Sequence, residues 1–498
     1  MKIALICDIH MSENIHSPQY AFFARAAKQI KEDGIKTVIG LGDITSYGEP
    51  GAMAMYQEAM QGFESYVLLG NAEVRNPKTK ELFLQDSQDV CIAAEGRKIL
   101  ALNSPSGRLT KEDRDKIKSL CDGDILLMHH GLHAFCDEDC GFLTKCFFRK
   151  QITFIHAHSH KKFDYSVGNS RVIGLRALDP DKSIGDFPCI TYVEISEKNI
   201  LVEEKVFEVS REVLSDIRRY FGISCVDNHR DLEYAANNKV GAVELRCNSS
   251  SWTPDMTLMP KLEAWRKETN GYLSVHMPNL KWDGEKITGV DQWREAVRYA
   301  VTINADGLTM HPPRAKKCDM PQGGATWQAF LDLYVYAVKN VGDHVKIGIE
   351  NLHMSSSEIT QRVDETELRF GYTPEEVTLW IDSINKSVGV QNRVGHLLDV
   401  GHARSNGNYA SIYTSSRWYE MMGKKTVGYH IHQVIAADGH TLNHNAIEDW
   451  FGPLISYVSF FYAWEQNMIN HVPVFLEVKG ADNFEKSMQS FDRKFAKK

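Results

Sequence analysis

The chain has 498 residues, of which 43% are hydrophobic and 24% charged, and its formal net charge at pH 7 is −8. The composition is typical of a globular protein, and the length exceeds what one hydrophobic core usually serves, so we expect two or more domains. The acidic balance argues against a large undifferentiated nucleic-acid surface, although a local basic cleft would fit it. No run approaches the roughly 18 apolar residues of a membrane span. The first residues become charged too early for a signal peptide, and the ten cysteines therefore predict reduced thiols in the cytoplasm.

Metal-binding side chains follow five apolar runs within the first 160 residues. These runs are predicted strands and cover residues 2–7, 37–41, 66–69, 124–128 and 152–155. The side chains that follow them are Asp8 and His10, Asp43, Asn71, His129, and His158 and His160. Ligands bind at the carboxyl ends of parallel strands, and carboxylate and imidazole groups bind divalent ions. The repeated pattern therefore predicts one metal site rather than separate packing residues.

In order and spacing these residues resemble the calcineurin-like metallophosphoesterases, whose motifs are D-x-H, G-D, G-N-H-[DE], an H before a small turn, and G-H-x-H. The resemblance implies two divalent transition metals (Mn, Fe or Zn) bridged by Asp43, which together act on a phosphoester bond. The ligands of the two ions would be Asp8, His10 and His160 for one, and Asn71, His129 and His158 for the other. We choose His129 over His130 because it directly follows the strand, and His130 becomes a candidate catalytic residue beside Asp43.

The chain departs from this family at residue 72, where Ala72 stands in place of the histidine of G-N-H-[DE]. In the family that histidine is usually assigned to charge stabilisation or to protonation of the leaving group. Proton transfer by a positioned side chain typically contributes about 10²–10⁴-fold to a rate. Three explanations stay open: an engineered inactive form, a natural enzyme that is weak or uses another acid such as His130, or a site that binds without turnover. Ala157, where the family usually has glycine, is a milder departure.

Two alternating segments, 190–195 and 200–207, predict a hairpin that closes a first domain of residues 1–209. Ser210 is a suitable N-cap for a helix that reaches about Tyr220, so residues 210–222 are a predicted connector. Beyond it, strand and helix candidates alternate up to residue 498, and the strands cover residues 223–226, 242–245, 272–275, 307–310, 345–349, 396–398, 427–429 and 472–476. Eight such repeats predict a TIM barrel over residues 223–498. The expected fold class is α/β, an αββα metallophosphoesterase sandwich followed by a (β/α)8 barrel.

The predicted barrel strands also end in ligands: Glu244 and Arg246, His276, His311, Glu350, Asp399 and His402, His430 and His432 (with His440 and His444 beyond), and Glu477. This half resembles the xylose isomerase-like TIM barrels, the superfamily that includes the endonuclease IV-type nucleases (AP endonuclease family 2). In the sugar isomerase and epimerase branch one metal would be held by Glu350, Asp399, His430 and Glu477, and the two glutamates would also move protons.

The endonuclease IV branch implies further metals. Taking the two branches together, we expect one to three ions in the barrel. His276 and His311 would share Glu350 as a bridge, and His402 and His444 would hold an outer ion. Leu442 stands where an aspartate is expected, so the outer ion lacks one ligand unless His432 or His440 replaces it. The candidate substrate-binding residues are Arg246, Arg314, Arg404 and His432, and Lys316 and Lys317 are further candidate anion contacts. The two extra imidazoles favour a multinuclear phosphoesterase-type centre.

The leading interpretation is a two-domain metal-dependent hydrolase that acts on a phosphorylated sugar, a nucleotide or a nucleic-acid end, with Asp43, Glu350, Glu477 and His130 as catalytic residues. A first alternative is a sugar-phosphate isomerase or epimerase barrel fused to a phosphatase. A second is a catalytically impaired phosphoesterase domain that serves as a ligand-binding or regulatory module, because of Ala72. The expected partner is the substrate alone, without a membrane.

Overall fold

The computed structural model of the chain describes residues 1–249, 251–360, 364–437 and 440–495. They form two compact units, one made of Met1–Glu208 and Phe451–Ser459, and the other of the rest of the chain. The first unit contains mixed sheets and the second a closed barrel of eight parallel strands, so the predicted α/β fold class is confirmed. Within the described ranges, every helix is too short or too polar to serve as a membrane span.

Two sheets make up the centre of the first unit. The first sheet has the order β11-β10-β1-β2-β3 and contains β1 (Lys2–Ile6), β2 (Thr37–Leu41), β3 (Glu64–Leu68), β10 (Cys189–Ile195) and β11 (Ile200–Val206). The second has the order β4-β5-β6-β7-β9-β8 and contains β4 (Val90–Ala94), β5 (Arg97–Leu102), β6 (Ile125–Met128), β7 (Thr153–His156), β8 (Phe163–Val167) and β9 (Ser170–Gly174). The ligand-bearing strands thus come from both sheets. In the first sheet β1, β2 and β3 run parallel to one another, and in the second β5, β6 and β7 do.

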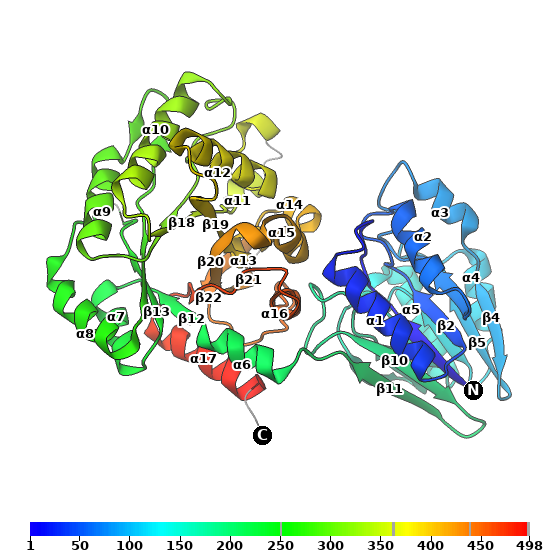
Figure 1. Cartoon of the computed structure of the whole chain (residues 1–498). Coiled ribbons are helices and arrows are strands. Elements are labelled where there is room, and N and C mark those ends of the chain that lie inside the picture. Colours follow the sequence, from blue (N-terminus) through cyan, green and yellow to red (C-terminus); the bar gives the residue numbers. More distant parts are fainter. Residues whose placement is uncertain (250, 361–363, 438–439, 496–498) are drawn as a thin grey trace. The chain divides into compact units, whose positions relative to one another are not determined.

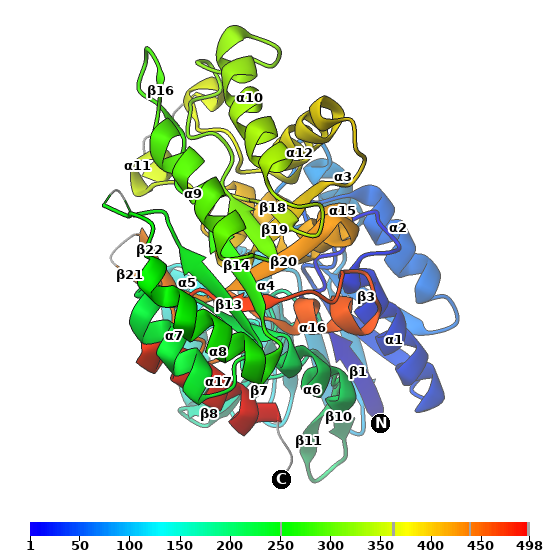
Figure 2. The same ribbon diagram turned by 60° about the vertical axis from the view of Figure 1, so that its left-hand side comes forward.

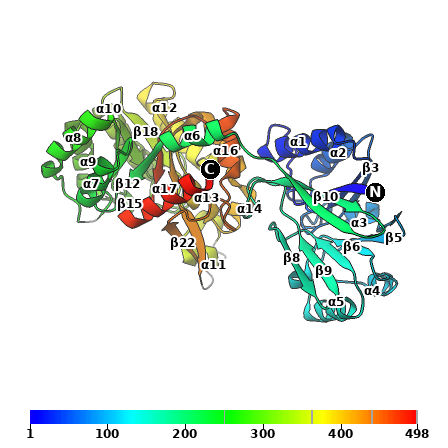
Figure 3. The ribbon, with the colours of Figure 1, turned by 90° about the horizontal axis from the view of Figure 1, so that it is seen from below.

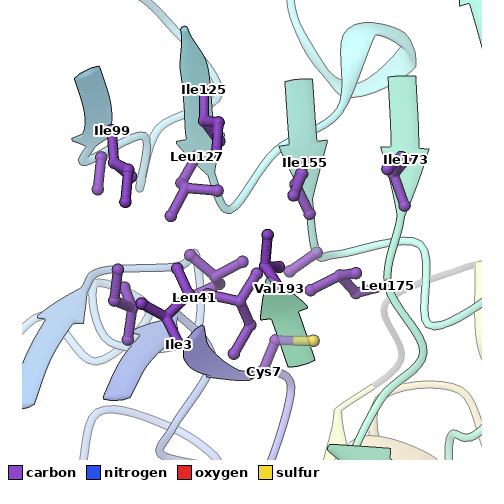
Figure 4. Close-up of a cluster of buried hydrophobic side chains, with 14 of the residues drawn as sticks. Ile3, Cys7, Leu41, Ile99, Ile125, Leu127, Ile155, Ile173, Leu175 and Val193 are labelled. Carbon is purple, nitrogen blue, oxygen red and sulfur yellow. The ribbon is translucent and has the colours of Figure 1, made fainter. Parts of the chain in front are cut away.

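Branched aliphatic side chains from the two sheets pack against each other. Ile3 and Leu41 of the first sheet face Ile125, Leu127 and their neighbours in the second, and all are buried (Figure 4). Helices cover the outer faces, so that α1 and α2 lie on one side and α4 and α5 on the other (Figure 3). The helices of this unit are α1 (Pro18–Glu32), α2 (Pro50–Ala59), α3 (Lys80–Asp86), α4 (Lys111–Lys118) and α5 (Asp137–Arg149), with a 3-10 turn at Leu132–Ala134.

The first unit also contains a short segment from late in the chain, Phe451–Ser459. Phe451 accepts a backbone hydrogen bond from Gly185 at 3.0 Å, and its ring packs edge-on against Phe187 with centroids 5.0 Å apart. Helix α16 (Val458–Glu465) begins inside this segment.

The second unit is a TIM barrel. Its strands are β12 (Phe221–Ser224), β13 (Ala242–Arg246), β14 (Tyr272–His276), β17 (Gly307–Met310), β18 (Lys346–Glu350), β19 (Val394–Asp399), β20 (Thr426–Ile431) and β23 (Val474–Leu476). They pair in this order and β23 closes on β12. Each predicted barrel strand is present, and the bounds differ by a few residues.

Helices surround the barrel strands (Figures 1 and 2). They are α6 (Arg211–Arg219), α7 (Asn228–Asn237), α8 (Met259–Thr269), α9 (Val290–Thr302), α10 (Ala325–Asn340), α11 (Ser356–Thr360), α12 (Pro374–Val388), α13 (Val400–Arg404), α14 (Tyr409–Ile412), α15 (Ser415–Met422) and α17 (Ala481–Phe495). Two small hairpins lie in the loops, β15 (Lys281–Trp282) with β16 (Ile287–Thr288) and β21 (Gln433–Ala437) with β22 (His440–Asn445). Ser210 caps α6 as predicted, because its side chain accepts a hydrogen bond from the backbone of Val213.

Candidate metal centres

The first centre lies beyond the carboxyl ends of the ligand-bearing strands of the first unit. Asp43 follows β2 and presents its two oxygens to different imidazoles: Oδ2 is 3.2 Å from His10 Nε2, and Oδ1 is 3.5 Å from His129 Nε2. Asp8 Oδ1 lies 3.5 Å from His160 Nε2. A carboxylate placed between two sets of imidazoles has the geometry of a bridge between two cations.

The remaining predicted ligands gather around His129. Its Nε2 atom is 3.3 Å from Asn71 Oδ1 and 3.2 Å from His158 Nδ1. The other ring nitrogen, Nδ1, lies 2.8 Å from the carbonyl oxygen of Leu41. A proton on Nδ1 satisfies that carbonyl and leaves the Nε2 lone pair for a metal. All seven predicted ligands of this centre are therefore brought together.

The backbone at this site is held in a conformation that L-residues rarely adopt. The ligands with φ between 50° and 67° are Asp8, His10, Asp43, His158 and His160. Left-handed backbone costs of order 1–3 kcal/mol per non-glycine residue and is concentrated at functional sites. Gly70 is required here, because a Cβ at this position would lie 2.3 Å from Asp43 Oδ1. These turns direct the ligand side chains that follow successive strands toward one point.

Glu73 fixes the two loops that carry Asp43 and Asn71. Its buried carboxylate accepts hydrogen bonds from the backbone N–H groups of Asp43 at 3.0 Å, Thr45 at 2.9 Å and Gly70 at 2.8 Å. Sequence reasoning assigned Glu73 no role, although its place as the acidic residue of the G-N-x-[DE] motif was a signal. Because one carboxylate accepts three charge-assisted hydrogen bonds from these loops, it makes them rigid.

Ala72 is the residue at which the sequence departs from the G-N-H-[DE] motif, and His130 is the candidate replacement acid. Ala72 is fully buried, and its backbone N–H donates to Asp43 Oδ1 at 2.7 Å. His130 lies beside His158 with ring centroids 4.5 Å apart, and its Nδ1 is 3.3 Å from Ser104 Oγ. Burial and the nearby His129 lower the pKa of His130 to about 3. Its imidazole is therefore neutral at pH 7.

The donor set of the first centre fits divalent metals. Burial lowers the pKa of His10 and of His158 to about 4, so both present neutral lone pairs at pH 7. Burial raises the pKa of Asp43, but the neighbouring His129 and His10 lower it more, and the carboxyl stays ionised. Asp8 Oδ1 is buried and has no hydrogen-bond partner among the described residues. Carboxylates and neutral imidazoles that meet around a buried bare oxygen suit Mn, Fe or Zn.

The second centre lies at the carboxyl ends of the barrel strands, around the fully buried Glu350. Its Oε2 atom is 3.1 Å from Nε2 of both His276 and His311. Its Oε1 atom is 3.2 Å from His430 Nδ1 and 3.3 Å from His402 Nδ1. Glu350 thus joins two pairs of imidazoles, one through each oxygen.

His430 is held between ligands and a carboxylate deeper in the barrel. Its Nδ1 lies 3.3 Å from Glu477 Oε2 and 4.0 Å from Asp399 Oδ2. Its Nε2 lies 2.8 Å from Oε2 of Glu244, which is fully buried on β13. Glu244 therefore orients His430, as carboxylates behind metal-binding histidines commonly do.

An outer group of ligand atoms adjoins the inner one. The atoms lie within 4.8 Å of one another and belong to His402, His432, His444 and Glu477. His432 Nε2 is also 3.2 Å from Asp399 Oδ1. Leu442 is half exposed, and the side chain of His440 lies outside the described part of the chain. His432 thus stands with the outer ligands, in addition to its predicted role toward substrate.

The predicted substrate-binding arginines lie in three different settings. Arg246 pairs with the ligand Glu477. Arg314 donates from Nε to Asn279 Oδ1 at 2.9 Å, and the same oxygen is 2.6 Å from His311 Nδ1. Sequence reasoning missed Asn279, which no motif marks.

The other predicted cations are held by protein groups. Arg404 donates to the carbonyl oxygen of Ala410 at 2.7 Å. Lys316 pairs with Glu367 at 2.7 Å and Lys317 with Glu376 at 2.5 Å. Arg246 therefore contacts a barrel ligand directly, and Arg314 is linked to one through Asn279.

The barrel donors also fit divalent metals. Asp399 Oδ2, His402 Nε2 and Glu477 Oε2 are buried, and among the described residues they have no hydrogen-bond partner. Burial lowers the pKa of His311 to about 4. Burial raises the pKa of Glu350, but His311 and His430 lower it more, to well below its usual range. A buried polar atom without a hydrogen-bond partner destabilises the fold unless a cation binds it.

Comparisons with known proteins follow this division of the chain. A family model described as calcineurin-like phosphoesterase matches residues 1–182, and one described as xylose isomerase-like TIM barrel matches residues 232–494. A search of curated proteins gave no match. Among solved structures, a D-tagatose 3-epimerase-like protein is 20% identical over 55% of this chain and 96% of its own, with a TM-score of 0.39.

Endonuclease IV from Thermus thermophilus is 13% identical over 55% of this chain and 98% of its own, with a TM-score of 0.37. D-allulose 3-epimerase from Methylomonas is 13% identical over 51% of this chain and 82% of its own, with a TM-score of 0.34. Both family models describe metal-dependent enzymes. The chain belongs to the xylose isomerase-like TIM barrel family and carries a calcineurin-like phosphoesterase domain at its amino-terminal end.

Proposed function

We propose that the chain is a metal-dependent phosphoester hydrolase with a dinuclear centre in the first unit and a multinuclear centre in the barrel. The observation that carries this proposal is the position of Asp43, whose two oxygens lie 3.2 Å and 3.5 Å from imidazoles of two different ligand sets. Two bound cations would clamp the phosphoryl oxygens and acidify an attacking water. His10 and His129 would hold one ion each, on either side of Asp43.

The residues around Ala72 set the expected substrate preference. A methyl group cannot donate a proton to a leaving group, and His130, which lies beside the ligands His129 and His158, is neutral at pH 7 because its pKa is lowered to about 3. His130 can therefore donate a hydrogen bond from a neutral ring but is a weak proton donor. We infer that esters with acidic leaving groups, such as aryl phosphodiesters, react faster than alkyl esters, because they leave without protonation.

Glu350 supports a multinuclear barrel centre. One of its oxygens faces His276 and His311, and the other faces His430 and His402. A single-metal site needs no pair of imidazoles on the far oxygen of its glutamate. The ions expected in the barrel are Mn, Fe or Zn, which imidazole-rich sites bind according to availability.

Arg314 supports a phosphorylated substrate for the barrel. Its side chain is partly buried, and no carboxylate of the described residues lies within ion-pair distance of it. Burial and the nearby Arg369 lower the pKa of Arg314, although it stays protonated at pH 7. An arginine without a carboxylate partner beside the ligand His311 suits a phosphate group. The substrate class is therefore a phosphorylated sugar, a nucleotide or a nucleic-acid end.

A second candidate function is a sugar-phosphate isomerase or epimerase barrel fused to the phosphatase. It is favoured by Glu350 and Glu477, whose oxygens lie 3.2 Å and 3.3 Å from the same atom, His430 Nδ1. In the sugar isomerase and epimerase branch that the barrel resembles, such a pair of glutamates also moves protons at carbon. A phosphoesterase domain that binds its ligand without turnover is the outcome favoured by Ala72 alone.

The experiment that tests the proposal is a substrate screen with Mn²⁺- or Zn²⁺-loaded protein. The substrates are an aryl phosphomonoester, an aryl phosphodiester, abasic DNA and a panel of ketose phosphates. Hydrolysis of any phosphoester, lost in Asp43→Asn or in Glu350→Gln, supports the proposal. Epimerisation without hydrolysis would support the second function, and binding without turnover would support a regulatory domain.

A further inference from the structure

A buried carboxylate lies behind one ligand of the first centre. Asp179 Oδ2 is 3.5 Å from His10 Nδ1, while His10 Nε2 faces Asp43 at 3.2 Å. Asp179 is 1% exposed. Neither Asp179 Oδ2 nor His10 Nδ1 has a hydrogen-bond partner among the described residues, so each is the nearest polar group offered to the other. The imidazole of His10 is therefore placed between a ligand carboxylate and a supporting one.

Asp179 is fixed in place by its own contacts. Its backbone N–H donates to the carbonyl oxygen of Asp8 at 3.0 Å, which ties it to the end of β1. Its Oδ1 accepts hydrogen bonds from Gln19 Nε2 at 3.1 Å and from the backbone of Asp181 at 2.9 Å. The same Gln19 nitrogen donates to Asp181 Oδ2 at 3.1 Å. One side-chain amide therefore holds both carboxylates.

The last contact of this group comes from the late segment Phe451–Ser459. Ser459 is fully buried, and its hydroxyl donates to Asp181 Oδ1. Ser459 lies outside residues 1–182, which the phosphoesterase family model matches, yet it belongs to the first compact unit. The contacts of Phe451 with Gly185 and Phe187 anchor the segment beside Asp181.

We propose that Asp179 is a positioning residue for His10, and that Ser459 completes its support through Asp181. Asp179 accepts the Nδ1 proton, so that the Nε2 lone pair points to the metal side of the ring. This inference rests on the proposed function, because it requires a metal at the first centre. Partners of this kind typically change metal affinity by about 10–100-fold. The metal centre then depends on a residue from late in the chain, since Ser459 lies 278 residues after Asp181.

The test measures Co²⁺ binding by visible absorption in full-length protein. Glu350→Gln and Glu477→Gln are present throughout to weaken the barrel centre. Asp179→Asn is expected to weaken Co²⁺ binding at the first centre by about 10–100-fold. Asp186→Asn is the matched control, because Asp186 lies in the same loop with a side chain that is 40% exposed. Wild-type affinity in Asp179→Asn would overturn the proposal.

A second pair of variants tests the late segment. Ser459→Ala removes the hydroxyl that supports Asp181 and is expected to weaken Co²⁺ binding several-fold. Ser456→Ala is its control, because Ser456 is buried in the same segment and its hydroxyl has no hydrogen-bond partner among the described residues. Equal affinities for the two serine variants would overturn the role of Ser459. This pair also carries the test if Asp179→Asn does not fold.

The same titration separates this inference from the proposed function. If the protein with intact Asp179 and Ser459 binds no Co²⁺ at the first centre, the dinuclear centre itself is refuted. If that protein binds Co²⁺ and Asp179→Asn binds it equally well, only the positioning role is refuted.

Discussion

The backbone N–H of His402 donates to Asp399 Oδ1 at 2.6 Å, and His402 Nδ1 lies 3.4 Å from Asp399 Oδ2. Asp399 is the last residue of β19, and His402 lies three positions later in α13. His402 Nδ1 also approaches Glu350 of the inner group at 3.3 Å. The same side chain belongs to the outer group with His432, His444 and Glu477. His402, like Glu477, thus belongs to both the inner and the outer ligand groups.

Loss of His402 should remove one ion and leave the others. We expect His402→Ala to lower the metal content by about one ion per chain, because the outer group loses one of its four ligands while Glu350 keeps His276, His311 and His430. The measurement is elemental analysis of metal-loaded protein. His353→Ala is the control. The ring centroid of His353 is 4.7 Å from that of His402, but His353 is not one of the inner or outer ligands given above. An unchanged metal content in His402→Ala would refute the outer site.

A histidine at position 72 should restore the missing proton donor. We expect Ala72→His to raise kcat on an alkyl phosphodiester by about 100-fold or more, and to change an aryl substrate less, because the aryl group leaves without a proton. Ala72→Gln is the control for bulk at this buried position. The measurement is initial rates on both substrates. Equal rates for the two variants on the alkyl ester would show that the general-acid argument is wrong.

Removal of the Glu244 charge should weaken the barrel centre through His430. Glu244 Oε2 is 2.8 Å from His430 Nε2, and a lost partner of this kind costs about 10–100-fold in metal affinity. We expect Glu244→Gln to release barrel metals at lower chelator concentrations than the parent protein. The measurement is metal retention during a chelator titration. The Asp43-dependent activity is the internal control and should be unchanged.

The buried His396 should make the barrel less stable in acid. It is fully buried and its ring stacks on Trp418 with centroids 5.5 Å apart. Burial lowers the pKa of His396 from 6.5 to about 3. Between these values the unfolded chain binds a proton at this residue and the folded protein does not. The free energy of unfolding therefore falls as the pH falls from 6.5 toward 3, by about 2 kcal/mol at pH 5.

His396→Phe keeps an aromatic ring against Trp418 and removes this titration. We expect the variant to lose less stability than the parent between pH 7 and pH 5. The measurement is thermal unfolding of the barrel in a chelating buffer, since acid also releases metals from their ligands. Parallel pH profiles for the two proteins would contradict the assigned shift.

Features that depend on a short stretch of sequence could be predicted. The barrel strands and the seven ligands of the first centre follow apolar runs that end in imidazoles and carboxylates, and such runs are readable residue by residue. Strands β4, β5, β8 and β9 were missed. In β4 and β8 the side chains are mostly half-buried or exposed, which leaves a weak apolar signal. The position of His432 among the outer ligands follows from a hairpin that the strand pattern did not reveal.

Supporting residues were harder to predict than ligands. Asp179 and Ser459 reach the first centre from positions 280 residues apart, and no short motif marks either one. Asn279 likewise supports His311 from a loop. Such residues are defined by packing between distant segments, whereas ligands lie at strand ends that a periodic pattern reveals.

The most direct test of the account is hydrolysis of bis(p-nitrophenyl) phosphate by Mn²⁺-loaded Asp43→Asn and Glu350→Gln. Several kcal/mol of transition-state stabilisation should be lost with the bridging carboxylate of the first centre. We therefore predict a decrease of about 100-fold or more in kcat/KM for Asp43→Asn and a rate near that of the parent for Glu350→Gln. Circular dichroism of both variants controls for folding. Full activity in Asp43→Asn would contradict the account.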